Sequence, residues 1–392
     1  MDFFKRRRIY LDYASSTPID ADMSATFPRL SAEVLMANPS ALHKEGMAAR
    51  ATLRVARELI ATTLFAHSDE IIFTASATES DNLALQGAVG ALTTNNNTQT
   101  PITIITTDVE HSAVIETANV LVQQCNVIVL STENGLLDPK TIFITDDMQA
   151  VIVSVIYVNN EIGVVQPIYD IAKRIRFLRK QHPQTTIILH IDATQAPLHY
   201  VLNMQKLGVD MMTLGATKLY CPKGIGLLYV KRGTPLSPIL HGGGQEHGLR
   251  PGTEPVQLIH FFAQSLAYAQ KNVPAYSEKI SALKHHFEML IKKEIPQATI
   301  TAESLERTPH ISHIAFKDFD SELLVLELDA RGIAVSAKSA CKNEDTNESS
   351  IVEKIYGKHW GAIRVSFGRM TTKREVSACV EAIKTVLQKY KK

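Results

Sequence analysis

The sequence predicts an α/β fold with two domains of unequal size. The chain has 392 residues, and 45% of them are hydrophobic. A single hydrophobic core stops growing at roughly 250 to 300 residues, so a chain of this length is expected to form two cores. From about residue 40 to 230, amphipathic helical stretches alternate with short apolar runs, the pattern of a mostly parallel sheet covered on both faces. We therefore expect a large domain over residues 16–255 and a smaller α/β domain built from 1–15 together with 256–392.

Seven apolar runs are the expected strands of the large sheet. They are EIIFTA, PITIITT, NVIVL, AVIVSVIYV, TTIILHID, VDMMTL and GIGLLYV. Helical periodicity is found between them, over 43–66, 80–92, 112–124 and 168–181. In the smaller domain we expect a long helical stretch over roughly 256–293, a mixed region that includes ISHIAFK and IRVSFGR, and a final lysine-rich helix.

Composition narrows the function classes. Lys and Arg number 41 against 40 Asp and Glu, so neither a nucleic-acid-binding field nor an acidic tail is present, and a small-molecule substrate is expected. No apolar run approaches the ~20 residues of a membrane helix, and no signal-peptide pattern begins the chain. The four cysteines show neither CxxC nor zinc-type spacing, so we expect no disulfide, no metal site and a reducing, cytoplasmic location.

Two strand ends carry opposite charges that suit one cofactor. TTIILHID ends in Asp192, and the run VDMMTLGAT leads to Lys218. In a parallel sheet, ligands bind at the carboxyl ends of the strands. Pyridoxal phosphate needs a lysine for its imine and a carboxylate that keeps its pyridine nitrogen protonated. Taken alone, Asp192 would be interpreted as a helix cap and Lys218 as a surface lysine. Lys223 in the PKGIG turn is the alternative imine lysine.

Several polar residues near other strand ends fit the rest of this cofactor. Ser76, Ala77 and Thr78 stand at a strand-to-helix turn, where free backbone N–H groups and the helix dipole favour phosphate, although Ser and Thr also cap helices. The remaining candidates are a stacking residue, His111, and two residues for hydrogen bonds to the ring oxygen, Asn160 and Gln195.

The sequence resembles the cysteine desulfurases over nearly its whole length. Ten motifs occur in the order found in that family: LDYASSTP, NPSALH, ATESDNLAL, EHSAV, VNNEIGVVQPI, HIDATQ, TKLYCPKGIG, GGGQEHGLRPGT, SAC and IRVSFGRMTT. They resemble the branch of iron–sulfur and nitrogenase-associated enzymes. The resemblance implies fold type I of the pyridoxal-phosphate enzymes, a homodimer, and conversion of L-cysteine to L-alanine with an enzyme persulfide. It also implies a sulfur acceptor, such as an iron–sulfur scaffold or a transfer-RNA thiolation enzyme.

The same resemblance implies roles for individual residues. The persulfide falls on Cys341 and the imine on Lys218, while Arg364, assisted by Asn38, binds the substrate carboxylate. Thr253 reaches the phosphate bound by the partner subunit. The implied cofactor contacts within the subunit are Asp192, His111, Ala77, Thr78, Asn160, Gln195 and Thr217.

The other cysteines provide one alternative nucleophile. Cys221 lies three residues after Lys218, but we expect its turn to hold it too rigidly to deliver sulfur. Cys125 and Cys379 lie on helical patterns and are expected to be structural. Cys341 sits in a polar segment, and Lys338, where the family has glycine, favours its thiolate.

Alternative functions remain within and outside the enzyme class. Gly215, Ala216 and Thr217 replace the family's Ser-Gly-His before the lysine, so we expect weaker cofactor retention with phosphate contact kept through Thr217. A selenocysteine lyase or another class V enzyme shares the fold, and an aminotransferase would not need Cys341. A non-catalytic partner in sulfur trafficking is the remaining alternative, against which the intact functional residues weigh.

Overall fold

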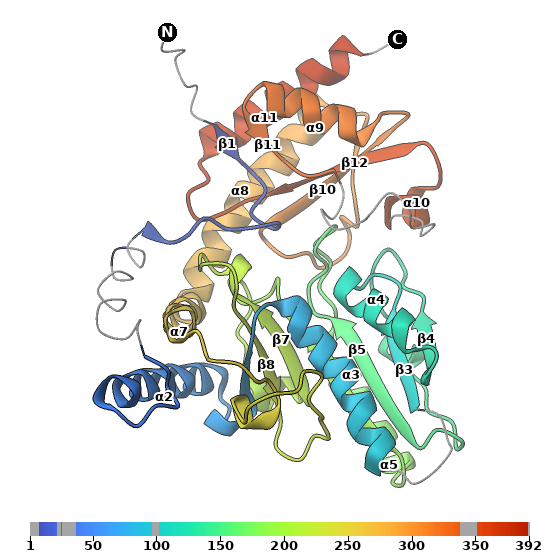
Figure 1. Cartoon of the computed structure of the whole chain (residues 1–392). Coiled ribbons are helices and arrows are strands. Elements are labelled where there is room, and N and C mark those ends of the chain that lie inside the picture. The colour runs from blue at the N-terminus through green and yellow to red at the C-terminus, as the bar shows by residue number, and fades with distance from the viewer. Residues whose placement is uncertain (1–7, 22–24, 26–36, 96–101, 338–350, 391–392) are drawn as a thin grey trace.

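The computed structural model describes residues 8–21, 25, 37–95, 102–337 and 351–390. Figure 1 shows two sheets one above the other, each with its own helices. We call the lower assembly the large-sheet part, comprising β2–β8 and α2–α7, and the upper one the small-sheet part, comprising β1, β9–β12 and α8–α11.

The large sheet has seven strands in the order β2-β8-β7-β6-β5-β3-β4. Six of the strands run in one direction and β8 runs opposite to them, which confirms the expected mostly parallel sheet. The strands are β2 (Ile71–Thr74), β3 (Ile102–Thr107), β4 (Cys125–Leu130), β5 (Ala150–Ile156), β6 (Thr186–Asp192), β7 (Met211–Gly215) and β8 (Gly226–Val230).

Cys125 corrects one expectation. It pairs with Ile102 as the first residue of β4, because the preceding helix ends at Leu121 and the chain turns before the strand. The apolar spacing up to Val122 continued the helical pattern, so the sequence alone did not show the turn.

Helices cover both faces of the large sheet, because successive residues of each strand point apolar side chains to opposite faces. Val151, Val153 and Val155 of β5 join one apolar core, whereas Ala150 and Ile152 join the core on the opposite face. The first core also receives α2 (Lys44–Leu64), α5 (Ile168–Gln181), α6 (Met204–Leu207) and α7 (Val256–Lys271), and the second α3 (Ala77–Asn95) and α4 (Ser112–Leu121).

The small-sheet part is an antiparallel sheet packed against three helices. Its strands have the order β12 (Trp360–Ser366), β10 (Ile311–Lys317) and β9 (Ala298–Ile300). Its core receives α8 (Val273–Glu294), α9 (Ser321–Ala330) and α11 (Lys373–Lys389). The short α10 (Ile351–Tyr356) precedes β12. The pair β1 (Ile9–Tyr10) and β11 (Ile333–Ala334) brings the N-terminal segment to this part.

The long helical stretch expected over 256–293 is present, with one break that the sequence did not show. The chain forms two helices, α7 and α8, which separate at Asn272, with Pro274 in the first turn of α8. The buried face of α7 belongs to the core of the large sheet. The division at residue 255 stays a prediction, and this packing favours a boundary at Asn272 instead.

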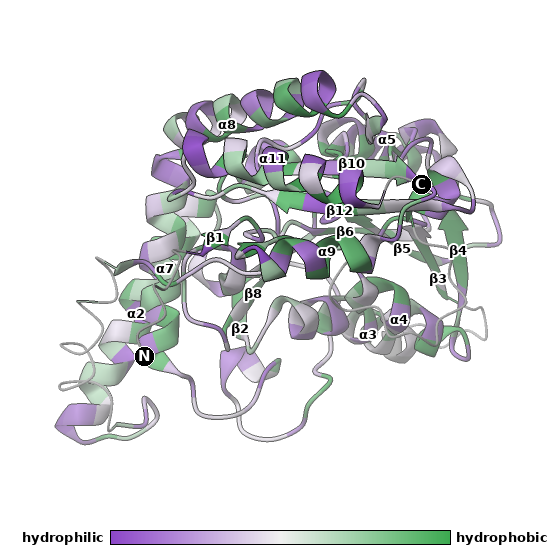
Figure 2. Ribbon diagram, turned by 90° about the horizontal axis from the view of Figure 1, so that it is seen from above, coloured by the Kyte–Doolittle hydropathy of each residue, from purple (hydrophilic) through white to green (hydrophobic). Residues whose placement is uncertain are grey.

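Hydropathy agrees with this layering. Figure 2 shows green, apolar segments along the strands and purple, hydrophilic stretches along α8, α9 and α11. The last helix begins with a capping box in which Thr372 and Glu375 satisfy each other's backbone N–H groups. Among the described residues, no helix is both long and apolar enough to cross a membrane.

Candidate active site

A cavity of about 260 Å³ lies at the carboxyl ends of the large-sheet strands. Most of the predicted site residues line it, although they come from segments far apart in the sequence. They are Ala77, Thr78, His111, Asn160, Asp192, Gln195, Thr217, Lys218 and Arg364. Asn38 and Thr253 are exposed and do not line it, and Cys341 lies outside the described residues. Their predicted roles stay predictions.

Lys218 reaches the cavity from a 3-10 turn, Ala216–Lys218, that directly follows β7. Its Nζ donates a hydrogen bond to the backbone carbonyl of Ser15. Lys223 is exposed and does not line the cavity. Of these two lysines, therefore, only Lys218 has its amine at the site.

Asp192 is the last residue of β6 and is 5% exposed. Its Oδ1 accepts a hydrogen bond from the N–H of Thr194 in the turn after the strand. The next helix begins only at Met204, so Asp192 is not a helix cap. Because this carboxylate and the Lys218 amine line one cavity, the pair predicted from two strand ends does meet in space.

Two further carboxyls lie close to Asp192, and the sequence reasoning missed both. Asp81 of α3 lines the cavity, and burial followed by repulsion from Asp192 raises its pKa well above the usual range. Glu110 accepts hydrogen bonds from the Thr107 hydroxyl and the Ile156 N–H, and burial raises its pKa to about 8. Within the described part of the chain, Asp81 Oδ1 and Glu110 Oε2 have no hydrogen-bond partner.

His190 links these acids to the sheet interior. Its Nδ1 lies 2.9 Å from the Ser154 hydroxyl and its Nε2 lies 3.0 Å from the Thr213 hydroxyl. Burial lowers the pKa of His190 to about 4, so the imidazole is neutral at pH 7. Asp81 Oδ1 is 3.7 Å from Nε2, and a neutral imidazole offers it no counter-charge.

The N-terminus of α3 forms the side of the cavity expected to bind phosphate. The Ser76 hydroxyl accepts from the N–H of Glu79, so Ser76 caps the helix, while Ala77 and Thr78 line the cavity. Gly226 of β8 permits this turn to pack closely, because a Cβ there would lie 2.4 Å from the carbonyl carbon of Ser76. Capping and anion binding are thus compatible here.

His111 and Gln195 reach the cavity while bonded to the protein. His111 caps α4, and its Nδ1 accepts from the N–H of Ala113. Gln195 donates to the carbonyl of Ala14, and its Oε1 lies 3.0 Å from His310 Nε2. Gln195 therefore ties the cavity wall to the small-sheet part, a role that the sequence did not indicate.

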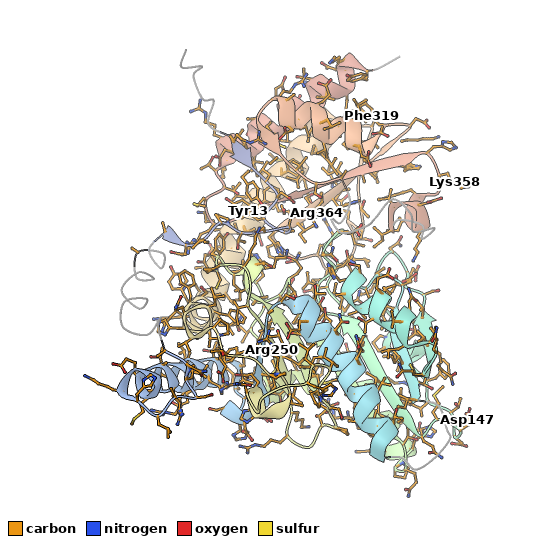
Figure 3. All side chains as sticks on the ribbon, in the orientation of Figure 1. Tyr13, Asp147, Arg250, Phe319, Lys358 and Arg364 are labelled. Carbon is orange, nitrogen blue, oxygen red and sulfur yellow. The ribbon has the colours of Figure 1, made fainter. Side chains whose placement is uncertain are left out.

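Arg364 of β12 closes the cavity from the small-sheet part. Figure 3 shows Arg364 and Tyr13 at the level between the two sheets. The Arg364 side chain is 4% exposed, and its Nη1 donates to the carbonyl of Asn160. Its Nη2 donates to the Asp12 carboxylate and to the Ser15 hydroxyl. Asp12 and Ser15 were missed because nothing in the motif LDYASSTP indicated a partner 352 residues away.

The described cysteines are buried. Burial raises the pKa of the Cys221 thiol to about 12, which leaves almost no thiolate at pH 7, in line with the expectation that Cys221 is not the nucleophile. Burial likewise raises the pKa of Cys125 to about 11 and that of Cys379 to about 12. Cys379 lies on α11, as expected, and packs in the small-sheet core.

The chemistry of this cavity fits pyridoxal phosphate. It combines a lysine amine, a buried carboxylate and the N-terminus of a 19-residue helix. Two buried polar atoms of its lining, Asp81 Oδ1 and Thr194 Oγ1, have no hydrogen-bond partner among the described residues. The fold and the site together define a fold type I pyridoxal-phosphate enzyme.

Comparison with known proteins narrows this class. The model of the family Aminotransferase class-V matches residues 9–379. "Cysteine desulfurase IscS" of Dictyoglomus turgidum is 32% identical over 391 residues, covering 98% of this chain and 95% of the relative. A solved NifS-like protein has a TM-score of 0.85 at 28% identity, with 97% and 99% coverage of the two chains. The structure "SspA in complex with cysteine" has a TM-score of 0.74 at 30% identity, with 92% and 98% coverage.

These likenesses extend over nearly the full chain. The protein belongs to the class V aminotransferase family and, within it, to the cysteine desulfurases.

Proposed function

We propose that this protein removes sulfur from L-cysteine, releases L-alanine and keeps the sulfur as a persulfide on Cys341. The observation that carries the proposal is that Lys218, Asp192 and Arg364 line one cavity. Asp192 ends β6, Lys218 follows β7, and Arg364 lies within β12. The bound cysteine of the SspA structure and the names of the relatives support the choice of substrate.

Pyridoxal phosphate would be held by residues of the large-sheet part. Lys218 would bind it covalently, and Asp192 would keep the proton on its pyridine nitrogen. Backbone N–H groups at Ala77 and Thr78, together with the hydroxyl of Thr217, would bind the phosphate, and His111 would stack on the ring. When bound, the cofactor supplies an electron sink for the bonds at the substrate α-carbon.

The protein side chains then bind the substrate and move its protons. Arg364 binds the α-carboxylate, and the Lys218 amine accepts the α-proton. The Cys341 thiolate attacks the substrate sulfur, so an S–S bond forms as the C–S bond breaks. The electron pair of that bond stays on the substrate carbon, which takes up a proton and becomes the methyl group of L-alanine.

Assembly and location complete the proposal. A homodimer would place Thr253, which is exposed in a single subunit, near the partner's phosphate. The persulfide would pass to an acceptor protein such as an iron–sulfur scaffold or a transfer-RNA thiolation enzyme. Neither nucleic acid nor a membrane would be a direct partner, and the cytoplasm would supply the reducing conditions that keep Cys341 a thiol.

The test is a product assay with purified protein, pyridoxal phosphate, L-cysteine and a reductant. Alanine and sulfide should form in equal amounts, and Cys341→Ala should lose both by about 100-fold or more. Cys221→Ala is the matched control and should retain both activities.

Wild-type protein that forms neither product contradicts the desulfurase proposal. Unchanged sulfide release by Cys341→Ala contradicts only the assignment of the nucleophile. Selenocysteine supplied in place of cysteine distinguishes the lyase alternative through the ratio of the two kcat/KM values.

A further inference from the structure

The guanidinium of Arg364 is already largely engaged before any substrate binds. Nη1 donates to the Asn160 carbonyl at 2.6 Å, and Nη2 donates to Asp12 Oδ1 at 3.0 Å and also to the Ser15 hydroxyl. Nη2 carries two hydrogens, so both are used. Of the three guanidinium nitrogens of Arg364, Nε alone is buried with no acceptor among the described residues.

This arrangement limits how a carboxylate can bind. A guanidinium presents two edges with parallel N–H groups, Nε with Nη2 and Nη1 with Nη2, and both edges include Nη2. A bidentate substrate carboxylate must therefore displace either Asp12 or Ser15 from Nη2. Nε has no acceptor among the described residues, so the Nε–Nη2 edge keeps one donor for the carboxylate.

Asp12 and Ser15 differ in how easily they are displaced. Asp12 is charged and forms an ion pair with Arg364, whereas Ser15 offers a neutral hydroxyl. Ser15 also donates its own hydroxyl hydrogen to Asp12 Oδ1 at 2.8 Å, so it keeps a partner after losing Arg364. The substrate carboxylate would accordingly replace Ser15 and leave Asp12 in place.

We propose that Asp12 is a positioning residue that sets the affinity of Arg364 for the substrate carboxylate. It holds the guanidinium in place, and its negative charge stays beside Arg364 when the carboxylate of the substrate arrives. This inference rests on the proposed role of Arg364 in binding that carboxylate. One cation then serves two anions, and the repulsion between them weakens binding.

The consequence extends to the product. L-Alanine carries the same α-carboxylate as L-cysteine, so Asp12 weakens the binding of both equally. Affinity that is equal in ground and transition states lowers KM without raising kcat. Asp12 would thus raise KM for cysteine while speeding the release of alanine.

The deciding experiment measures binding of L-alanine to the cofactor-loaded protein by isothermal titration calorimetry. Asp12→Asn keeps the shape and an acceptor for Nη2 but removes the charge. We expect the dissociation constant for L-alanine, and the KM for cysteine, to fall by about threefold to tenfold. L-Alaninamide, which lacks the carboxylate, should bind equally well to both proteins.

The chain offers a matched control and a second variant. Asp20→Asn removes a similar ion pair, which joins Asp20 of the same N-terminal segment to Arg369 after β12. This variant should leave the dissociation constant for L-alanine and the KM for cysteine unchanged. Ser15→Ala removes the hydroxyl that the substrate displaces and should tighten L-alanine binding by about twofold. If Asp12→Asn does not fold, which thermal unfolding reports, unchanged or weaker L-alanine binding by Ser15→Ala overturns the displacement of Ser15 on which the inference depends.

The sign of the change is decisive. If Asp12 only orients Arg364, Asp12→Asn will weaken L-alanine binding, and a raised or unchanged dissociation constant overturns the inference. Equal effects on L-alanine and L-alaninamide overturn it as well. L-Alanine binding requires no sulfur removal, so wild-type protein that binds L-alanine without desulfurating cysteine contradicts the proposed function and leaves this inference standing.

Discussion

The buried carboxyls with a raised pKa, chiefly Asp81 and Glu110, lie beneath the cavity in the large-sheet part, which also holds the neutral imidazole of His190. At the junction with the small-sheet part lie bases whose pKa burial lowers. They are Lys284, His199, His310 and His313. Desolvation holds each of these groups closer to its neutral form.

The difference has a consequence for stability. A buried acid with a raised pKa holds its proton in the folded state after the unfolded chain has lost it, so its contribution falls as pH rises. A buried base with a lowered pKa does the reverse, and its contribution falls as pH drops. The buried acids and the buried bases should therefore respond to pH in opposite directions, and the following changes test this contrast.

The largest effect should come from Lys218→Ala. Lys218 is the one lysine among the described residues that lines the cofactor cavity, so this change should reduce alanine formation by about three orders of magnitude or more. The visible absorbance of the bound cofactor should disappear as well. Lys223→Ala is the control, and loss of the band in that variant instead would move the cofactor lysine to the exposed turn.

Glu110→Gln should flatten the alkaline loss of stability in the large-sheet part. Burial raises the pKa of Glu110 to about 8 from its ordinary value of 4.5, so the stability that Glu110 contributes is lost as pH rises between these values. Glutamine keeps an acceptor for Thr107 and Ile156 and has no proton to lose. Urea unfolding at pH 8.5 should show a gain of about 2 kcal/mol, with none at pH 4.5.

The exposed Glu116→Gln of α4 provides the comparison, and it should change stability at neither pH. If the stability of the wild-type protein rises from pH 5 to 8, and Glu110→Gln leaves this pH dependence unchanged, then buried acids do not control the alkaline loss of stability.

Lys284→Met should give a smaller effect of opposite pH dependence. Burial, followed by repulsion from Arg307, lowers the pKa of Lys284 to about 7 from 10.5, so its contribution is lost as pH falls from 10.5 to 7. Methionine avoids the buried charge but leaves the Thr308 carbonyl without its 2.9 Å hydrogen bond. We expect a net gain of about 1 kcal/mol at pH 7 that shrinks by pH 9.5, measured by urea unfolding.

Lys271→Met at the exposed end of α7 is the matched control. A gain that grows instead with rising pH would show that Lys284 is charged in the folded protein under alkaline conditions.

Much of the fold was predictable because it depends on local periodicity. Strands β2 to β8 each coincide with an apolar run, and α2 and α5 with amphipathic patterns. The sequence did not show two breaks, the turn before Cys125 and the separation of α7 from α8 at Asn272. There the turn depends on a few backbone torsions, and hydrophobic spacing does not encode them.

The site divides in the same way. Asp192 and Lys218 were predictable because parallel strands bring their carboxyl ends to one edge of the sheet. Asp81 and Glu110 carried no signal, because acids near a helix N-terminus are ordinary in sequence, and only packing shows that these two are buried.

The sequence by itself determined the α/β class, the mostly parallel sheet, the family and the lysine–aspartate pair, since periodicity, strand ends and ordered motifs are local properties of the chain. The tertiary structure alone decided which partners surround those residues. Asp12 meets Arg364 and Gln195 meets His310 across the junction between the two sheets, and desolvation there sets which buried groups stay neutral. Such contacts depend on how distant segments pack, which no local pattern records.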